Sequence, residues 1–109
     1  MQAFNMTTRM QKYKKELCFL GRCSKTQRNR YLNAAPSMLI RAVGDSAKSL
    51  LEGNLPISNY YRKKLRKDIN ILKKLATRGV PITTKKKILQ SQRGGALLPI
   101  IFNVLKNLF

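Results

Sequence analysis

Apolar residues recur along most of this chain at intervals of three and four, the spacing that places them on one face of an α-helix. The alternation of apolar and polar residues that marks a half-buried strand is absent from the sequence. The first apolar stripe follows a candidate cap at Thr7 or Thr8, and we expect Gly21 to end or weaken this helix. The stripe consists of Met6, Met10, Tyr13, Leu17 and Leu20.

Two further helices are expected before the middle of the chain. Ser24 is a candidate N-cap for a short basic helix over about 25–34. Pro36 suits the first turn of the next helix, where its missing N–H group costs nothing. This helix ends at Gly53-Asn54 and carries few charges, so we expect it at the centre of the core. Its stripe is Leu39, Val43, Ala47 and Leu50, with Ile40 and Leu51 beside them.

The clearest amphipathic segment is a predicted helix over about 59–78, with Ser58 as its N-cap and Gly79 and Pro81 after its end. One face carries Tyr61, Leu65, Ile69, Leu72 and Leu75 or Ala76. A last basic turn begins at Thr83 or Thr84. The remaining surface of both segments supplies the residues that we expect to hold nucleic-acid phosphates: Arg62, Lys63, Lys64, Arg66, Lys67, Lys73, Lys74, Arg78, Lys85, Lys86 and Lys87.

The chain becomes largely apolar near its C-terminus, where residues 96–109 hold a single charge, Lys106. Pro99 suits the first turn of an apolar helix. This helix either docks on the rest of the protein or is a membrane-active or partner-binding peptide on a flexible Gly94-Gly95 hinge. The predicted fold class is all-α: a small bundle of four to five short helices with an apolar C-terminal helical tail. The predicted division is a basic nucleic-acid-binding domain over 1–92, then the hinge and tail over 93–109.

The net charge of the chain narrows the range of possible binding partners. The 109 residues include 23 Lys and Arg but only four Asp and Glu, a formal net charge of +19. This charge opposes compaction unless an anionic partner neutralises it. Duplex DNA, with one phosphate per ~1.7 Å of helix axis, is the favoured partner over an anionic membrane or an acidic protein. A merely solvated surface would mix both signs of charge. A second, more diffuse phosphate contact is expected from Arg9, Lys12, Lys14, Lys15, Arg22, Lys25, Arg28 and Arg30.

Binding without sequence preference is expected, because base readout favours Asn, Gln and Arg on a helix that enters the major groove. Asn70 lies near the basic face, but nothing distinguishes it. Tyr60 could stack on a base, although Tyr60 and Tyr61 are more simply anchors of the first helical turn.

Enzymatic chemistry has few candidate residues in this sequence. There is no His, and the four carboxylates are scattered without a pair at helical spacing. Cys18 and Cys23 are five positions apart, which is neither a CxxC motif nor part of a four-ligand zinc set, so we expect buried or reduced thiols, with a regulatory or intermolecular bridge as the alternative. No catalytic site, metal or cofactor is therefore predicted. Arg9 and the lysines that follow interrupt any signal peptide, and the longest apolar stretch, 96–102, is too short to span a bilayer, so an intracellular protein is expected.

The segment Gln92-Arg93-Gly94-Gly95-Ala96-Leu97-Leu98-Pro99-Ile100-Ile101 resembles the precursor of the adenovirus core protein X, the mu-type DNA-condensing peptide. Together with Leu51-Glu52-Gly53-Asn54-Leu55-Pro56-Ile57-Ser58 and the basic helix, it is also similar to small proteins of adintoviruses and Polinton-type elements, over about 38–109. The resemblance implies a virion core protein that condenses the DNA genome, located in the virion interior and the host nucleus. It also implies cleavage by an adenovirus-type cysteine protease between Gly95 and Ala96. Gln92 stands where the substrates of that protease have an apolar residue.

Two other functions fit parts of the pattern. A ribosomal or nucleolar RNA-binding protein would share the charge and the helices but would not need the Gly-Gly apolar tail. A cationic membrane-active protein would act first through residues 96–109. The C-terminal tail is also a candidate contact for a membrane or a capsid protein.

Overall fold

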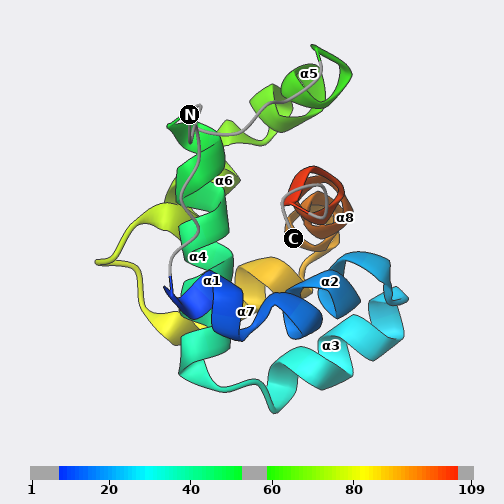
Figure 1. The fold of residues 1–109 in the computed structure, drawn as a ribbon, viewed down its shortest axis with the longest axis vertical. Helices are drawn as coiled ribbons and strands as arrows, with labels where there is room; N and C mark the ends of the chain where they lie inside the picture. Colours follow the sequence, from blue (N-terminus) through cyan, green and yellow to red (C-terminus); the bar gives the residue numbers. More distant parts are fainter. Residues whose placement is uncertain (1–7, 53–58, 106–109) are drawn as a thin grey trace.

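The computed structural model describes residues 8–52 and 59–105, and within these ranges every regular element is an α-helix (Figure 1). The predicted all-α fold is therefore confirmed. The helices are short because two of the predicted ones are each divided in two. Their bounds are α1 Thr8–Lys12, α2 Lys14–Arg22, α3 Lys25–Asn33, α4 Ser37–Leu51, α5 Asn59–Lys67, α6 Ile69–Ala76, α7 Ile82–Gln90 and α8 Gln92–Leu105.

The central helix is α4, as its low charge predicts. Its apolar face is fully buried, and α4 packs against α1, α2, α6, α7 and α8. Helix α6 approaches α4 closely at Gly44, where an added Cβ atom would lie 2.6 Å from the carbonyl oxygen of Leu75. Glycine thus allows the α6 backbone to approach α4 more closely than any side chain would permit.

Tyr13 divides the predicted N-terminal helix into α1 and α2. Its backbone, at φ −106° and ψ 20°, leaves the helical region for one residue before α2 begins. After α2, Ser24 caps α3 as predicted. The Ser24 Oγ accepts the backbone N–H of Gln27 at 3.2 Å, while the Gln27 Oε1 accepts the backbone N–H of Ser24 at 3.1 Å. This reciprocal pair satisfies two N–H groups that a helix terminus would otherwise leave without partners.

Asp68 divides the predicted 59–78 helix into α5 and α6. Its φ of −117° and ψ of 30° interrupt the helix, and its N–H donates to the carbonyl of Leu65, three residues back, at 3.1 Å. Within α5, Leu65 is the buried residue, whereas α6 buries Leu72 and Leu75 against the core. The break directs α5 away from α4, so that α5 lies at one end of the molecule (Figure 1).

The C-terminal helix, α8, packs on the rest of the protein and is not a separate tail. Helix α8 packs against α2 and α7, and its buried residues are Leu97, Leu98, Ile101 and Phe102. The predicted hinge is wrong because Gly94 and Gly95 lie in the first turn of α8, which therefore begins before the expected boundary at residue 93. Pro99 lies inside this helix and not in its first turn.

Gly21 has a different role from the expected one. Helix α2 continues through it to Arg22, and an added Cβ atom at Gly21 would lie 2.7 Å from the Phe102 Cβ. Its missing side chain lets α8 approach α2. The predicted cap at Ser58, the helix end at Gly53-Asn54 and the charge of Lys106 lie outside the described residues. Among the helices that are described, none is both long and apolar enough to cross a membrane.

Candidate nucleic-acid interface

The surface of α5, α6 and the turn after them is densely cationic. The helical period buries Leu65, Leu72 and Leu75 and turns the basic residues between them outward. Eight of the eleven predicted phosphate-binding residues lie here and are exposed. We call these eight the α5–α6 basic face: Arg62, Lys63, Lys64, Arg66, Lys67, Lys73, Lys74 and Arg78.

Carboxylates do little to neutralise this face. Asp68, at the break between the two helices, is half-buried and is the one acid between residues 59 and 78. Six members of the face form neither an ion pair nor a ring contact with any residue that the structure describes, so their charges remain available to a ligand. These six are Lys63, Arg66, Lys67, Lys73, Lys74 and Arg78.

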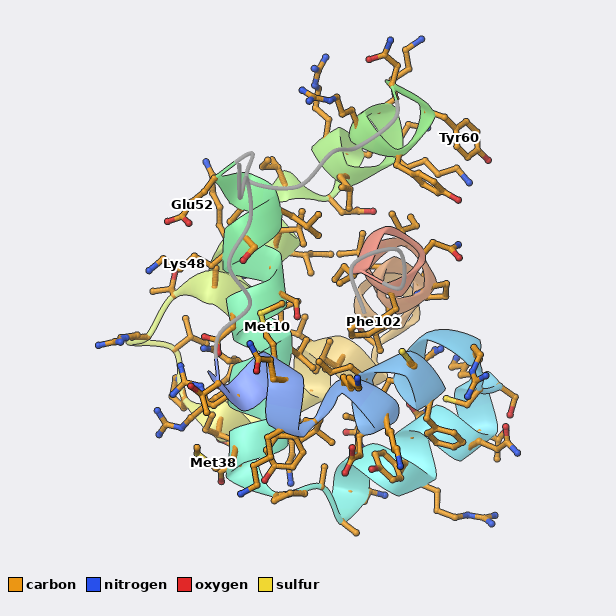
Figure 2. All side chains as sticks on the ribbon, viewed as in Figure 1. Met10, Met38, Lys48, Glu52, Tyr60 and Phe102 are labelled. Carbon is orange, nitrogen blue, oxygen red and sulfur yellow. The ribbon has the colours of Figure 1, made fainter. Side chains whose placement is uncertain are left out.

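Tyr60 adds an aromatic surface at the end of this face. It is one of the two large apolar side chains that the described structure exposes, with 62% of its surface accessible (Figure 2). The Lys64 Nζ lies 4.5 Å from its ring centroid, and Tyr61 meets the ring edge-on at 5.3 Å. A ring held beside cations in this way suits stacking on an unpaired base.

The three lysines of the predicted basic run Lys85–Lys87 do not share one exposed surface. Lys87 is exposed and Lys86 is half-buried, but Lys85 retains only 5% of its accessible surface. Lys85 is four residues before the buried Leu89 and shares its face of α7, which packs against α4 and α6. Lys85 therefore does not belong to the exposed basic surface, and its contact with a phosphate stays a prediction.

Lys85 instead lines a cavity of about 530 Å³ between α1, α4 and the turn that joins α6 to α7. Arg9, on the rim, donates from Nε and Nη2 to the two carboxylate oxygens of Asp45, each at 2.9 Å. Burial lowers the pKa of Lys85, and the charge of Arg41 lowers it further, while Asp45 opposes both effects. The remaining basic residues of the lining are Arg41, Lys48 and Arg78.

Arg41 and Lys48 were not among the predicted site residues. Together with Asp45 they recur at intervals of four and three along α4, opposite the apolar stripe. This polar stripe on an otherwise apolar helix was visible in the sequence. The sequence did not show that this stripe lines a cavity, because the cations that face it come from α1, α7 and the α6–α7 turn.

Six of the eight residues predicted for the second phosphate contact are exposed. Lys12, Lys14, Lys15, Arg22, Lys25 and Arg30 are exposed on α1, α2 and α3. Arg9 is instead engaged with Asp45, and Arg28 is buried against α8, where an added Cβ at Gly95 would lie 2.7 Å from the Arg28 Cζ. Of the predicted set, Arg28 is therefore a packing residue.

The predicted cleavage site lies inside folded structure. Gly95 is buried, and its N–H donates to the carbonyl of Ser91 at 2.9 Å, as the first turn of α8 requires. Proteases bind their substrates as extended segments, so cleavage between Gly95 and Ala96 requires the start of α8 to unwind.

Cys18 and Cys23 are free and half-buried. Burial raises the pKa of the Cys23 thiol, which keeps it in the less reactive protonated form. No group of three His, Cys, Asp or Glu residues that could hold a metal ion occurs in the described part of the chain.

Comparison of the chain with protein-family models, with curated proteins and with solved structures finds no match.

Proposed function

We propose that this protein binds double-stranded DNA without sequence preference and condenses it. The observation that carries the proposal is the α5–α6 basic face, in which seven exposed cations on two neighbouring helices and an eighth in the turn after them accompany one half-buried acid. Phosphate contacts of this kind supply most of the free energy of non-specific binding. Lysine and arginine side chains on a convex helical surface reach phosphates without entering a groove.

The composition of the face supports backbone binding over base readout. On α5 and α6 the exposed amide side chains are Asn59 and Asn70, eleven positions apart on different helices. Specific readout needs several such groups converging on adjacent base edges. The face therefore provides charge with little means of distinguishing one base pair from another.

Condensation requires more than one duplex contact, and the fold separates two basic surfaces. The cations of α5 lie at one end of the molecule, and the exposed cations of α2 and α3 lie at the other (Figure 1). A molecule that is basic at both ends can bridge two duplexes and screen their mutual repulsion.

The virion setting of the proposal rests on the resemblance of residues 92–101 and 51–58 to adenovirus core protein X and to adintovirus proteins. In that setting the DNA is the viral genome, and the protein accompanies it in the host nucleus and the virion interior. Cleavage after Gly95 by a viral cysteine protease would then proceed on a chain whose α8 has partly unwound.

The membrane-active alternative is less well supported. Its apolar surface would be that of α8, but Leu97, Leu98, Ile101 and Phe102 are all buried in the core. The RNA-binding alternative shares the same cations, so it is separated from DNA binding by experiment.

The test is the affinity of the full chain for duplex DNA of two unrelated sequences and for duplex RNA, measured across a salt series. We expect similar affinities for the two DNA sequences and a log–log salt slope of about −0.9 for each phosphate contacted. Stronger binding to RNA than to DNA would favour the RNA-binding alternative. Weak binding that does not respond to salt would refute nucleic-acid binding through this face.

A further inference from the structure

The cavity beside Lys85 differs in kind from the α5–α6 basic face. It is a hollow of about 530 Å³, within the size range of small-ligand sites. Its basic lining comes from parts of the chain far apart in sequence: Arg9 from α1, Arg41 and Lys48 from α4, Arg78 from the α6–α7 turn, and Lys85 from α7. Figure 2 shows Lys48 projecting from α4 on the side of that turn.

Lys85 is the residue that needs an explanation. Only 5% of its surface is accessible, yet it forms no hydrogen bond and no ion pair with any described residue. Its Nζ lies near Gly44, 3.7 Å from where a Cβ of that residue would be. A cationic side chain that loses most of its contact with water and gains no partner destabilises the folded protein. An anion in the cavity would supply the missing partner.

The rest of the lining is also complementary to an anion. Asp45 is the one carboxylate among the lining residues, and it is paired with Arg9, so that Arg41, Lys48, Arg78 and Lys85 contribute four uncompensated positive charges. Helix α7 begins at the cavity, since Pro81 and Ile82 line it. No side chain caps that terminus, so its first N–H groups remain available as donors.

We propose that this cavity is a binding site for a small oligophosphate anion, with the Lys85 ammonium as its buried contact and Arg41, Lys48 and Arg78 around it. Guanidinium groups bind phosphate oxygens in pairs and an ammonium binds them as a point charge, so the set suits a ligand with several phosphate groups. Of these four residues Arg78 also belongs to the α5–α6 basic face, whereas Lys85, Arg41 and Lys48 do not.

Titration with tripolyphosphate at physiological ionic strength, followed by calorimetry and by the amide NMR signals of α7, tests the proposal. We expect saturable binding of one anion per chain, with signal changes concentrated at Ile82–Lys85, and weaker binding of inorganic phosphate. Lys85→Met should weaken tripolyphosphate binding at least about tenfold, because it removes the buried charge but keeps the length of the side chain.

Lys87→Met is the matched control. It lies on the same helix, carries the same charge and is exposed, so we expect it to change the affinity by less than about twofold. Arg41→Gln, on the exposed surface of α4, provides a second test that does not touch the core, and we expect it to weaken binding about as strongly as a lost charged hydrogen bond, ~10-fold. Equal losses in the Lys85 and Lys87 variants, or binding without saturation, would overturn the proposal in favour of diffuse attraction to a cationic protein.

Competition with duplex DNA identifies the source of the phosphate. If DNA displaces tripolyphosphate and Lys85→Met weakens DNA binding, the cavity receives a phosphate of the polynucleotide. If both bind together, the ligand is a free oligophosphate. Either result supports a phosphate site, and neither depends on whether the α5–α6 basic face binds DNA, since charge reversal of Lys63, Lys67 and Lys74 should leave tripolyphosphate binding unchanged.

Discussion

Lys85 illustrates how much one position on a helix can matter in a strongly basic chain. Three consecutive lysines carry the same formal charge, yet the helical turn of about 100° per residue buries Lys85, leaves Lys86 half-buried and exposes Lys87. The pKa of the buried one, Lys85, is lowered mainly by burial and is also influenced by the charges of Arg41 and Asp45 on α4. Lys85 thus destabilises the free protein, and in the proposed site it is a contact for an anion.

The lowered pKa of Lys85 predicts a pH dependence of stability. Between its folded pKa and its ordinary value of 10.5, the unfolded chain binds more protons than the folded one, so the contribution of Lys85 to the unfolding free energy rises with pH. Lys85→Met should abolish this rise and stabilise the anion-free protein near neutral pH by about 1 kcal/mol. Urea unfolding across this pH range in a buffer without phosphate measures both effects.

The difference between wild type and variant is the informative quantity. The raised pKa values of Cys23 and Tyr31 act in the opposite direction at high pH, but they are common to both proteins and cancel. The same pH slope in both proteins would contradict the role assigned to Lys85.

Gly44 gives a second prediction for a single residue. Gly44→Ala places a methyl group 2.6 Å from a backbone oxygen of α6, which cannot move without shifting that helix. We expect a loss of about 1–3 kcal/mol in unfolding free energy, despite the better helix propensity of alanine. Gly79→Ala is the control, because a Cβ there has no heavy atom within 4 Å. Chemical denaturation of both variants should show a large loss for Gly44 and almost none for Gly79.

Helices α5 and α6 are both amphipathic, but α6 buries more of its apolar face than α5 does. Helix α6 buries Leu72 and Leu75 and packs closely on α4, whereas α5 buries Leu65 and extends from the body of the molecule. The break at Asp68 makes this possible, because a continuous helix would hold both segments on one axis. As a result the cations of α5 are displayed at an end of the molecule, accessible from several sides.

Charge reversal of Lys63, Lys67 and Lys74 tests the α5–α6 basic face. Because these side chains are exposed and unpaired among the described residues, we expect the fold to be unaffected and DNA affinity to fall equally for all sequences. The log–log salt slope should become shallower by about three, one for each lost phosphate contact. Fluorescence anisotropy across a salt series measures both quantities.

Charge reversal of Lys12, Lys14 and Lys15 makes the same change in net charge on α1 and α2 and serves as the control. We expect it to reduce affinity less than reversal on the α5–α6 basic face. If the two variants lose the same affinity, binding follows net charge alone and the face has no special role.

At the scale of the whole molecule, the docking of α8 decides which part of the chain is a folding unit. The four buried apolar residues of α8 fill the space against α2 and α7, with contributions of about 1.5–3 kcal/mol each. Their sum is comparable to the total stability of a small domain, ~5–15 kcal/mol. The basic domain therefore includes its apolar tail.

Removal of everything after Gly95 should accordingly abolish cooperative unfolding. The fragment 1–95 would expose the faces of α2 and α7 that α8 covers, and we expect a broad, weak thermal transition by circular dichroism together with increased binding of a hydrophobic dye. A synthetic peptide of residues 96–109 should restore the cooperative transition. A fragment 1–95 that melts as sharply as the full chain, and at the same temperature, would show that α8 is dispensable.

The sequence by itself determined the helical class, the central place of α4, the capping of α3 by Ser24 and the amphipathic character of residues 59–78. These follow from local causes: the period of the apolar residues, the chemistry of a cap and the scarcity of charge in one segment. Only the tertiary structure decided the breaks at Tyr13 and Asp68, the docking of α8 and the burial of Lys85 and Arg28. Each of these depends on which helix lies against which, and a stripe of apolar or basic residues specifies a face without specifying its neighbour. The candidate anion cavity is of the second kind, because its cations come from α1, α4, the α6–α7 turn and α7, which only the packing of the helices brings together.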